Sequence, residues 1–204
     1  MPSGSSGTPA TFSRPRASSV EHDELARALR EHAYLEGDFV LRSGRRSSYY
    51  LDKYLFETRP ELLGPLGEAI ADAVQEVEPG TALLAGPELG AVALAASASL
   101  ASGLPFVIVR KEAKGYGTSK RLEGAFEEGE LACLVEDVVT SAGAALDAVE
   151  ALREAGLEVR NAVCVVDREE GGVDALAREG VRLRALFRVS DLAESPKSAA
   201  KPHG

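Results

Sequence analysis

Hydrophobic positions follow helical spacing in some parts of this chain and form continuous strand-like runs in others. Leucines and alanines spaced three or four residues apart predict a helix over residues 22–35, ended by Gly37, and another over Pro60–Val77. Two short β-prone runs, residues 39–44 and 48–52, are separated by polar residues and predict a pair of strands. The N-terminal part should therefore combine helices with a small hairpin.

Strands and helices alternate from residue 81 onward, with short linkers. Strands are expected at residues 81–85, 106–109, 131–135, 159–166 and 181–187, and helices at about residues 91–102, 144–155 and 173–179. This alternation predicts an α/β fold with a doubly wound, mainly parallel sheet flanked by helices. Ligands of such sheets bind beyond the carboxyl ends of the strands. The turns at Gly86, Arg110, Glu136 and Asp167 should share that edge.

Charge and composition narrow the classes of function. A net charge of −9 over 204 residues argues against a general nucleic-acid binder, which needs a basic surface. No apolar stretch approaches the ~20 residues needed to cross a bilayer, and the N-terminus lacks the apolar core of a secretion signal. We therefore expect a cytoplasmic protein with no nucleic-acid or membrane partner. Residues 1–19 and 195–204 should be disordered tails, which leaves one domain over residues 20–194.

Residues 134–145 carry the strongest chemical signal, because an apolar strand stops at two acids and opens into small, hydroxyl-bearing residues. A helix that begins near Ala144 presents unpaired backbone N–H groups, and Thr140 and Ser141 add hydroxyl donors, which suits a phosphate monoester. Glu136 and Asp137 would repel that phosphate, but their carboxylates can accept hydrogen bonds from ribose hydroxyls. A solvated turn with an ordinary helix cap is the alternative. Neither a GxGxxG nor a GxxxxGK[ST] signature is present.

Residues 110–121 form a second unusual segment, with five cations and one acid in an acidic protein. Gly115 and Gly117 give this loop freedom to move. Its cations suit a pyrophosphate, whose negative charge grows as it leaves. A plain solvated loop is the alternative.

Three segments together resemble orotate phosphoribosyltransferases, which are type I phosphoribosyltransferases. They are LRSGRRSSYYLD near the start, VRKEAKGYGTSKRLEG in the basic loop and LVEDVVTSAGAA at the turn, with VVDREEGG after the next strand. The resemblance runs from about residue 21 to residue 192. It implies the type I phosphoribosyltransferase fold with a small N-terminal hood over about residues 20–58. It also implies the transfer of ribose 5-phosphate from phosphoribosyl pyrophosphate (PRPP) to orotate, with Mg²⁺, to give orotidine 5'-monophosphate and pyrophosphate in UMP synthesis.

The same resemblance implies the site residues. Those for PRPP are Arg42, Arg110, Lys111, Lys114, Tyr116, Glu136, Asp137, Val138, Val139, Thr140, Ser141, Ala142, Gly143 and Ala144. Those for orotate are Tyr50, Leu51, Thr140 and Arg168, with Arg168 meeting the carboxylate. Lys111, Lys114 and Asp137 are the expected catalytic residues. A surface arginine paired with a nearby acid is the alternative for Arg168.

The implied partners are the two small-molecule substrates and a second copy of the chain, because the family loop closes over the neighbouring subunit's site. No side chain is named as a direct metal ligand, since Mg²⁺ binds chiefly through substrate oxygens and water. Tyr116 stands where the family usually has histidine, and Ser141-Ala142 replaces a Thr-Gly or Ala-Gly pair.

Three rival functions stay open. A regulatory protein could keep the pocket as a PRPP sensor, although the acidic pair and the basic loop are both intact. A transferase for another base, such as a purine, would not need Arg168 or the hood motif. A fusion partner of a decarboxylase would be expected to continue beyond this chain.

Overall fold

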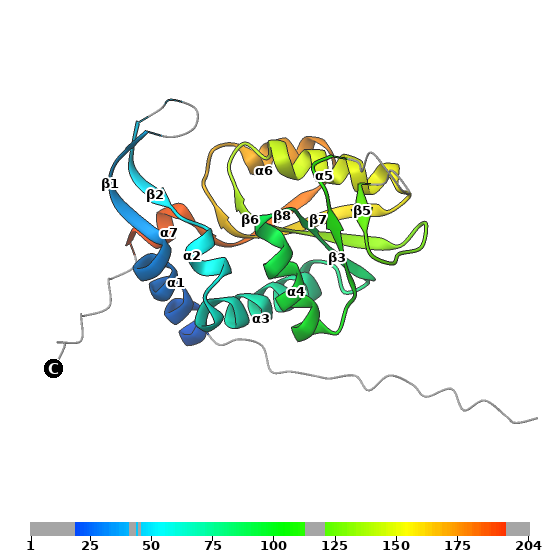
Figure 1. Cartoon of the computed structure of the whole chain (residues 1–204), viewed down its shortest axis with the longest axis horizontal. Coiled ribbons are helices and arrows are strands. Elements are labelled where there is room, and N and C mark those ends of the chain that lie inside the picture. Colours follow the sequence, from blue (N-terminus) through cyan, green and yellow to red (C-terminus); the bar gives the residue numbers. More distant parts are fainter. Residues whose placement is uncertain (1–18, 41–43, 45, 113–120, 195–204) are drawn as a thin grey trace, which may run out of the picture.

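The computed structural model describes residues 19–40, 44, 46–112 and 121–194 (Figure 1). A central sheet carries helices on both faces, and a two-stranded hairpin projects at one end of the molecule. The predictions for Arg42, Lys114 and Tyr116 concern residues outside the described ranges, and so do those for the tails at residues 1–18 and 195–204.

The N-terminal part consists of α1 (Ser19–Ala33), β1 (Tyr34–Val40), β2 (Arg46–Leu51) and α2 (Tyr54–Glu57). The expected helix is confirmed, but it ends at Ala33, and Gly37 was wrong as its terminator because it lies within β1. Tyr34 instead pairs with Leu51 across the antiparallel hairpin. Strand pairing with a distant segment has overridden the local helical spacing.

The remaining elements build the sheet and its cover. They are α3 (Pro60–Val77), β3 (Leu83–Pro87), α4 (Gly90–Ser102), β4 (Phe106–Val109), β5 (Leu122–Glu123), β6 (Leu131–Val139), α5 (Gly143–Glu154), β7 (Glu158–Asp167), α6 (Gly172–Arg178), β8 (Arg182–Arg188) and α7 (Val189–Glu194). The sheet order is β5-β4-β3-β6-β7-β8, and every pair is parallel except β4 with β5. The expected doubly wound, mainly parallel sheet is confirmed.

The sheet is buried on both faces, which explains its continuous apolar runs. Cys133 and Val135 of β6 pack into the core shared with α1, α3 and α4, whereas Ala132 and Leu134 pack into the core shared with α5. The order of the strands reverses at β3, which has β4 on one side and β6 on the other. A reversal of this kind opens a crevice at the carboxyl ends of the strands, where ligands bind.

Strand β6 is longer than its sequence predicts. The expected strand stopped at Val135, but pairing with β7 continues to Val139, which lies opposite Asp167. The placement of Glu136 and Asp137 in the turn was therefore wrong, and both lie on the strand itself. Elements α2, β5 and α7 were not expected either, because each is too short to show a repeating pattern. In the described part of the chain, no helix is long and apolar enough to span a membrane.

Candidate active site

The carboxyl ends of four adjacent strands form the candidate site. β4, β3, β6 and β7 are neighbours in that order, and they lead into Arg110, Glu88, Thr140 and Arg168 respectively. The fold thus brings the separate segments that the sequence singled out to one edge of the sheet. The backbone N–H of Arg168 donates a 2.9 Å hydrogen bond to the carbonyl of Val139, which joins the last two of these turns.

The turn between β6 and α5 has the backbone shape of an anion cradle. Ala142 adopts a left-handed conformation with φ of 65°, a region that favours glycine and is uncommon for other residues. It is the N-cap of α5, and no side chain caps this helix end. The first N–H groups of α5 therefore keep their hydrogen-bonding capacity for an anion.

Asp137 is held in place by a lysine that the sequence analysis did not single out. Lys53, just before α2, donates a 2.5 Å hydrogen bond from Nζ to Asp137 Oδ2, and Asp137 is only 4% exposed. Gly90, at the start of α4, makes room for this pair, because a Cβ there would lie 1.8 Å from Asp137 Oδ2 and 2.7 Å from Lys53 Nζ. Lys53 therefore holds the Asp137 carboxylate in one orientation at the candidate site.

Two further carboxyl groups lie beside this ion pair. Burial, followed by the negative charge of Asp137, raises the pKa of Glu57 to about 8. Burial and the charge of Asp137 likewise raise the pKa of Glu136 to about 8. Burial works against the charge on Lys53, but the hydrogen bond and charge of Asp137 outweigh it and raise the lysine pKa. One lysine thus faces three carboxyl groups, and Asp137 is the one it pairs with.

We expect Lys53→Met to lower kcat/KM by about 10- to 100-fold for a substrate that binds to Asp137. The reason is that a buried Asp137 without its cation would no longer be held in one orientation. Steady-state kinetics measure this change. Lys53→Arg, which keeps a cation at the position, is the matched variant and should retain most of the activity. Equal activity in the Lys53→Met and Lys53→Arg variants would contradict the role of Lys53.

We expect Glu136→Gln to flatten the pH dependence of thermal stability. The folded state raises the pKa of Glu136, so the stability that its proton contributes is fully present below the unfolded pKa and is lost as pH rises through about 8. The wild type should therefore lose on the order of a few kcal/mol more than the variant between about pH 5 and pH 9. Melting temperatures across this range test the effect, with exposed Glu154→Gln as control. Parallel curves for wild type and Glu136→Gln would rule it out.

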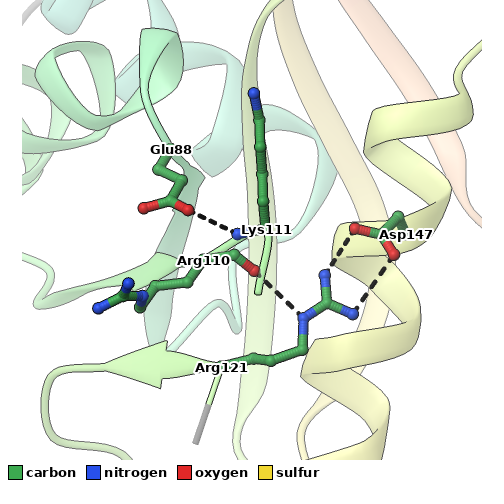
Figure 2. A network of polar contacts seen from close by, with 5 residues as sticks. All are labelled: Glu88, Arg110, Lys111, Arg121 and Asp147. Atoms are coloured by element: carbon green, nitrogen blue, oxygen red, sulfur yellow. Dashed lines mark hydrogen bonds and ion pairs between the residues drawn. The ribbon is translucent and has the colours of Figure 1, made fainter. Parts of the chain in front are cut away.

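The basic loop starts and ends on a fixed stem (Figure 2). The backbone N–H of Lys111 donates a 2.8 Å hydrogen bond to Glu88 Oε1, and that of Arg110 donates a 2.7 Å bond to the carbonyl of Arg121. Arg121 then binds both carboxylate oxygens of Asp147 on α5, at 2.6 and 3.3 Å. The Lys111 side chain extends away from Glu88 and Arg121. Both ends of the loop are therefore anchored to the strands and helix that form the site.

The residues expected around orotate come from two distant parts of the chain. Leu51, at the end of β2, is buried, whereas Tyr50 is 43% exposed. Arg168 Nη2 lies 3.2 Å from Glu170 Oε1 and donates a 3.3 Å hydrogen bond to the hydroxyl of Tyr49. The ion pair with Glu170 matches the alternative considered for this arginine, but Tyr49 also ties it to the hood. Thr140 follows β6 and is partly buried.

Sequence reasoning gave no role to the side chains of Lys53, Glu57, Tyr49 and Glu88, which the structure places at this edge. Tyr49 lies within a segment that was singled out, and its neighbours Tyr50 and Leu51 were chosen. A lone lysine or glutamate carries no local signal of its partner, and Lys53 lies 84 positions from Asp137.

The two acids on β6 offer few free ligand atoms to a metal ion. Within the described ranges, no group of three or more histidines, cysteines or acids could hold a metal ion. Asp137 is already engaged by Lys53, and Glu136 Oε1 is buried without a partner. Mg²⁺ needs few protein ligands when phosphate oxygens and water supply the others.

Comparisons with known proteins identify close relatives. A protein of Methanocella arvoryzae named orotate phosphoribosyltransferase is 52% identical over 170 residues, which cover 83% of this chain and 95% of the relative. One of the same name from Halobacterium salinarum is 48% identical over 174 residues, 85% of this chain and 97% of the relative. No family model matches the chain.

Solved structures agree with these relatives. Orotate phosphoribosyltransferase of Mycobacterium tuberculosis, described in complex with Fe(III) dicitrate, is 31% identical with a TM-score of 0.75 and covers 84% of this chain and 98% of its own. The enzyme of that organism in complex with PRPP is 28% identical, with a TM-score of 0.72, and covers 85% of this chain and 99% of its own.

Proposed function

Because the chain belongs to the orotate phosphoribosyltransferase family, we propose that its carboxyl-edge site transfers ribose 5-phosphate from PRPP to orotate with the residues assigned below. The enzyme is a pentosyltransferase that yields orotidine 5'-monophosphate and pyrophosphate in UMP synthesis. The observation that carries the assignment is the end of β6, where a paired, buried Asp137 leads into a left-handed turn and an uncapped helix.

The 5'-phosphate is assigned to the turn, where residues 140–144 and the N–H groups of α5 can donate hydrogen bonds to it. The ribose hydroxyls are assigned to Glu136 and Asp137 at the end of β6, with Val138 and Val139 shaping the strand end. Lys53 supports this assignment, because it fixes the Asp137 carboxylate in one orientation. The pyrophosphate is assigned to Arg110 and Lys111, together with Arg42, Lys114 and Tyr116.

The base is assigned to the space between the hood and the end of β7. Tyr50 and Leu51 flank the ring, Thr140 lies near it, and Arg168 meets the carboxylate. A guanidinium pairs well with a carboxylate through two parallel hydrogen bonds. Uracil lacks this carboxylate, so Arg168 is the residue that would select orotate.

The reaction needs no protein nucleophile. The bond between ribose C1' and the pyrophosphate oxygen breaks, positive charge builds on the ribose ring, and orotate N1 forms the new bond to C1'. The electron pair of the broken bond leaves with pyrophosphate, where Lys111 and the other loop cations stabilise it. Asp137 holds the ribose, and the loop excludes water. Magnesium, when bound, neutralises charge on the pyrophosphate, and no side chain of this chain is assigned to it directly.

The enzyme works as a homodimer in which each basic loop serves the neighbouring site. The exposure of Lys111 supports this, because its side chain extends away from Glu88 and Arg121 and is open to a neighbouring molecule. We place the enzyme in the cytoplasm, since its charged substrates do not cross a bilayer freely.

The test follows the loss of orotate absorbance after PRPP and Mg²⁺ are added to the purified chain. Orotate should be consumed, whereas uracil and hypoxanthine should react far more slowly. Consumption of hypoxanthine instead of orotate would indicate a purine transferase. PRPP binding without consumption of any base would indicate a sensor. Either result would contradict the proposal.

A further inference from the structure

Two arginine side chains and two tyrosine rings lie in a row that runs from Arg168, after β7, to Arg30 on α1. The Arg168 guanidinium carbon lies 5.2 Å from the centre of the Tyr49 ring. Tyr49 stacks on Tyr34 with ring centres 5.1 Å apart and planes 6° from parallel. The guanidinium carbon of Arg30 lies 4.9 Å from the centre of the Tyr34 ring. We call these four residues the ladder.

The ladder is anchored at its far end. Arg30 on α1 is 8% exposed and donates a 2.8 Å hydrogen bond from Nη1 to the carbonyl of Leu192 on α7. Its Nη2 donates a 2.5 Å bond to Glu36 of β1. Contacts with α7 and with the hairpin therefore restrain Arg30. The cation beside the Tyr34 ring is thus held in place.

Several contacts restrain Arg168 at the near end. Its side chain is 13% exposed, and its Nη2 is shared between the Tyr49 hydroxyl at 3.3 Å and Glu170 at 3.2 Å. A free arginine side chain loses rotamer entropy when it is fixed in one conformation. Because the ladder has already fixed this side chain, a ligand that pairs with it avoids most of that loss.

We propose that Tyr49, backed by Tyr34 and Arg30, is a positioning residue that holds the Arg168 guanidinium ready for the carboxylate of orotate. This inference rests on the proposed function, because it takes orotate as the ligand of Arg168. Tyr49 acts through the arginine and not on the reacting atoms. Its loss should therefore weaken orotate binding and selection against uracil while leaving the chemical step unchanged.

The first test measures kinetics of Tyr49→Leu and Tyr49→Phe. Tyr49→Leu removes the ring and the hydroxyl, so the KM for orotate should rise about tenfold, whereas Tyr49→Phe keeps the ring and should raise it only about two- to threefold. The KM for PRPP and kcat should stay within about twofold of wild type, as expected for a residue that affects binding of one substrate only. Phe126→Leu removes a partly buried aromatic ring from the other core and is the matched control.

A double-mutant cycle with Arg168→Ala separates positioning from general structure. If Tyr49 acts through Arg168, Tyr49→Leu should add less than about twofold to the orotate KM once Arg168 is absent. A full tenfold effect in that background would overturn the proposal. So would a fall in kcat or a rise in the PRPP KM as large as the change for orotate.

A second variant keeps the test decisive if Tyr49→Leu does not fold. Tyr34→Leu leaves Tyr49 in place and removes only its backing ring, so the orotate KM should rise about threefold through a weaker stack. An unchanged orotate KM in folded Tyr34→Leu and Tyr49→Phe would reject the ladder. If Arg168→Ala itself leaves the orotate KM unchanged, the proposed base site fails, and that outcome is distinct from failure of the ladder alone.

Discussion

Lys111→Ala is expected to lower kcat by about 100- to 1,000-fold and to change the KM for orotate by less than about threefold. The bond to pyrophosphate builds negative charge only as it breaks, so a cation placed there stabilises the transition state more than the bound substrates. The structure supports this role, because the Lys111 ammonium forms no ion pair with any described residue while its backbone is tied to Glu88. Steady-state and single-turnover kinetics measure the effect.

Glu112→Ala is the matched control for Lys111. Glu112 is the next residue in the same exposed turn and carries the opposite charge, and it has no part in the assigned site. Its kcat should stay close to that of the wild type. If Lys111→Ala turns over as fast as Glu112→Ala, the loop assignment is wrong.

Arg168→Ala should raise the KM for orotate by about 10- to 100-fold, since each charged hydrogen bond to a carboxylate contributes about 1.5–3 kcal/mol. Preference for orotate over uracil should fall by a similar factor, because the carboxylate is the group that distinguishes the two bases. The variant also removes the end of the ladder, so its melting temperature should be measured beside its kinetics. Parallel assays with the two bases provide the readout.

Two controls accompany this variant. Arg168→Lys keeps the charge but loses the planar fork, and it should give an intermediate KM. Arg188→Ala removes an exposed arginine of the neighbouring strand β8, which lies opposite Asp167. This change should leave the orotate KM unchanged. An orotate KM that is the same in Arg168→Ala and in the wild type would remove this arginine from the base site.

The layered sheet could be predicted from the sequence because its signals are local. Strands covered on both faces need continuous apolar runs, such as the one that begins β6, and helices need apolar residues every three or four positions. Short elements such as α2 and β5 were missed because they contain too few residues to show a period. The extension of β6 through Glu136 and Asp137 was missed because its acids do not resemble a buried strand, and pairing with β7 decides it.

Two segments of the candidate site also have signals in the sequence. Two acids before small hydroxyl-bearing residues, and a cluster of cations in an acidic chain, are signals within a few positions of one another. The sequence by itself thus determined the sheet and the family, and it indicated the turn after β6 as a phosphate site, since each of these has a local or motif signature.

Tertiary structure decided how the groups of the site are held and charged. Lys53 meets Asp137 across 84 positions, and Arg168 meets Tyr49 across 119 positions. Such pairs have no local signature, because only the packing of the hood against the sheet brings them together. The raised pKa values of Glu57 and Glu136 arise in the same way, since burial and a neighbouring charge are properties of the folded chain and not of the residue.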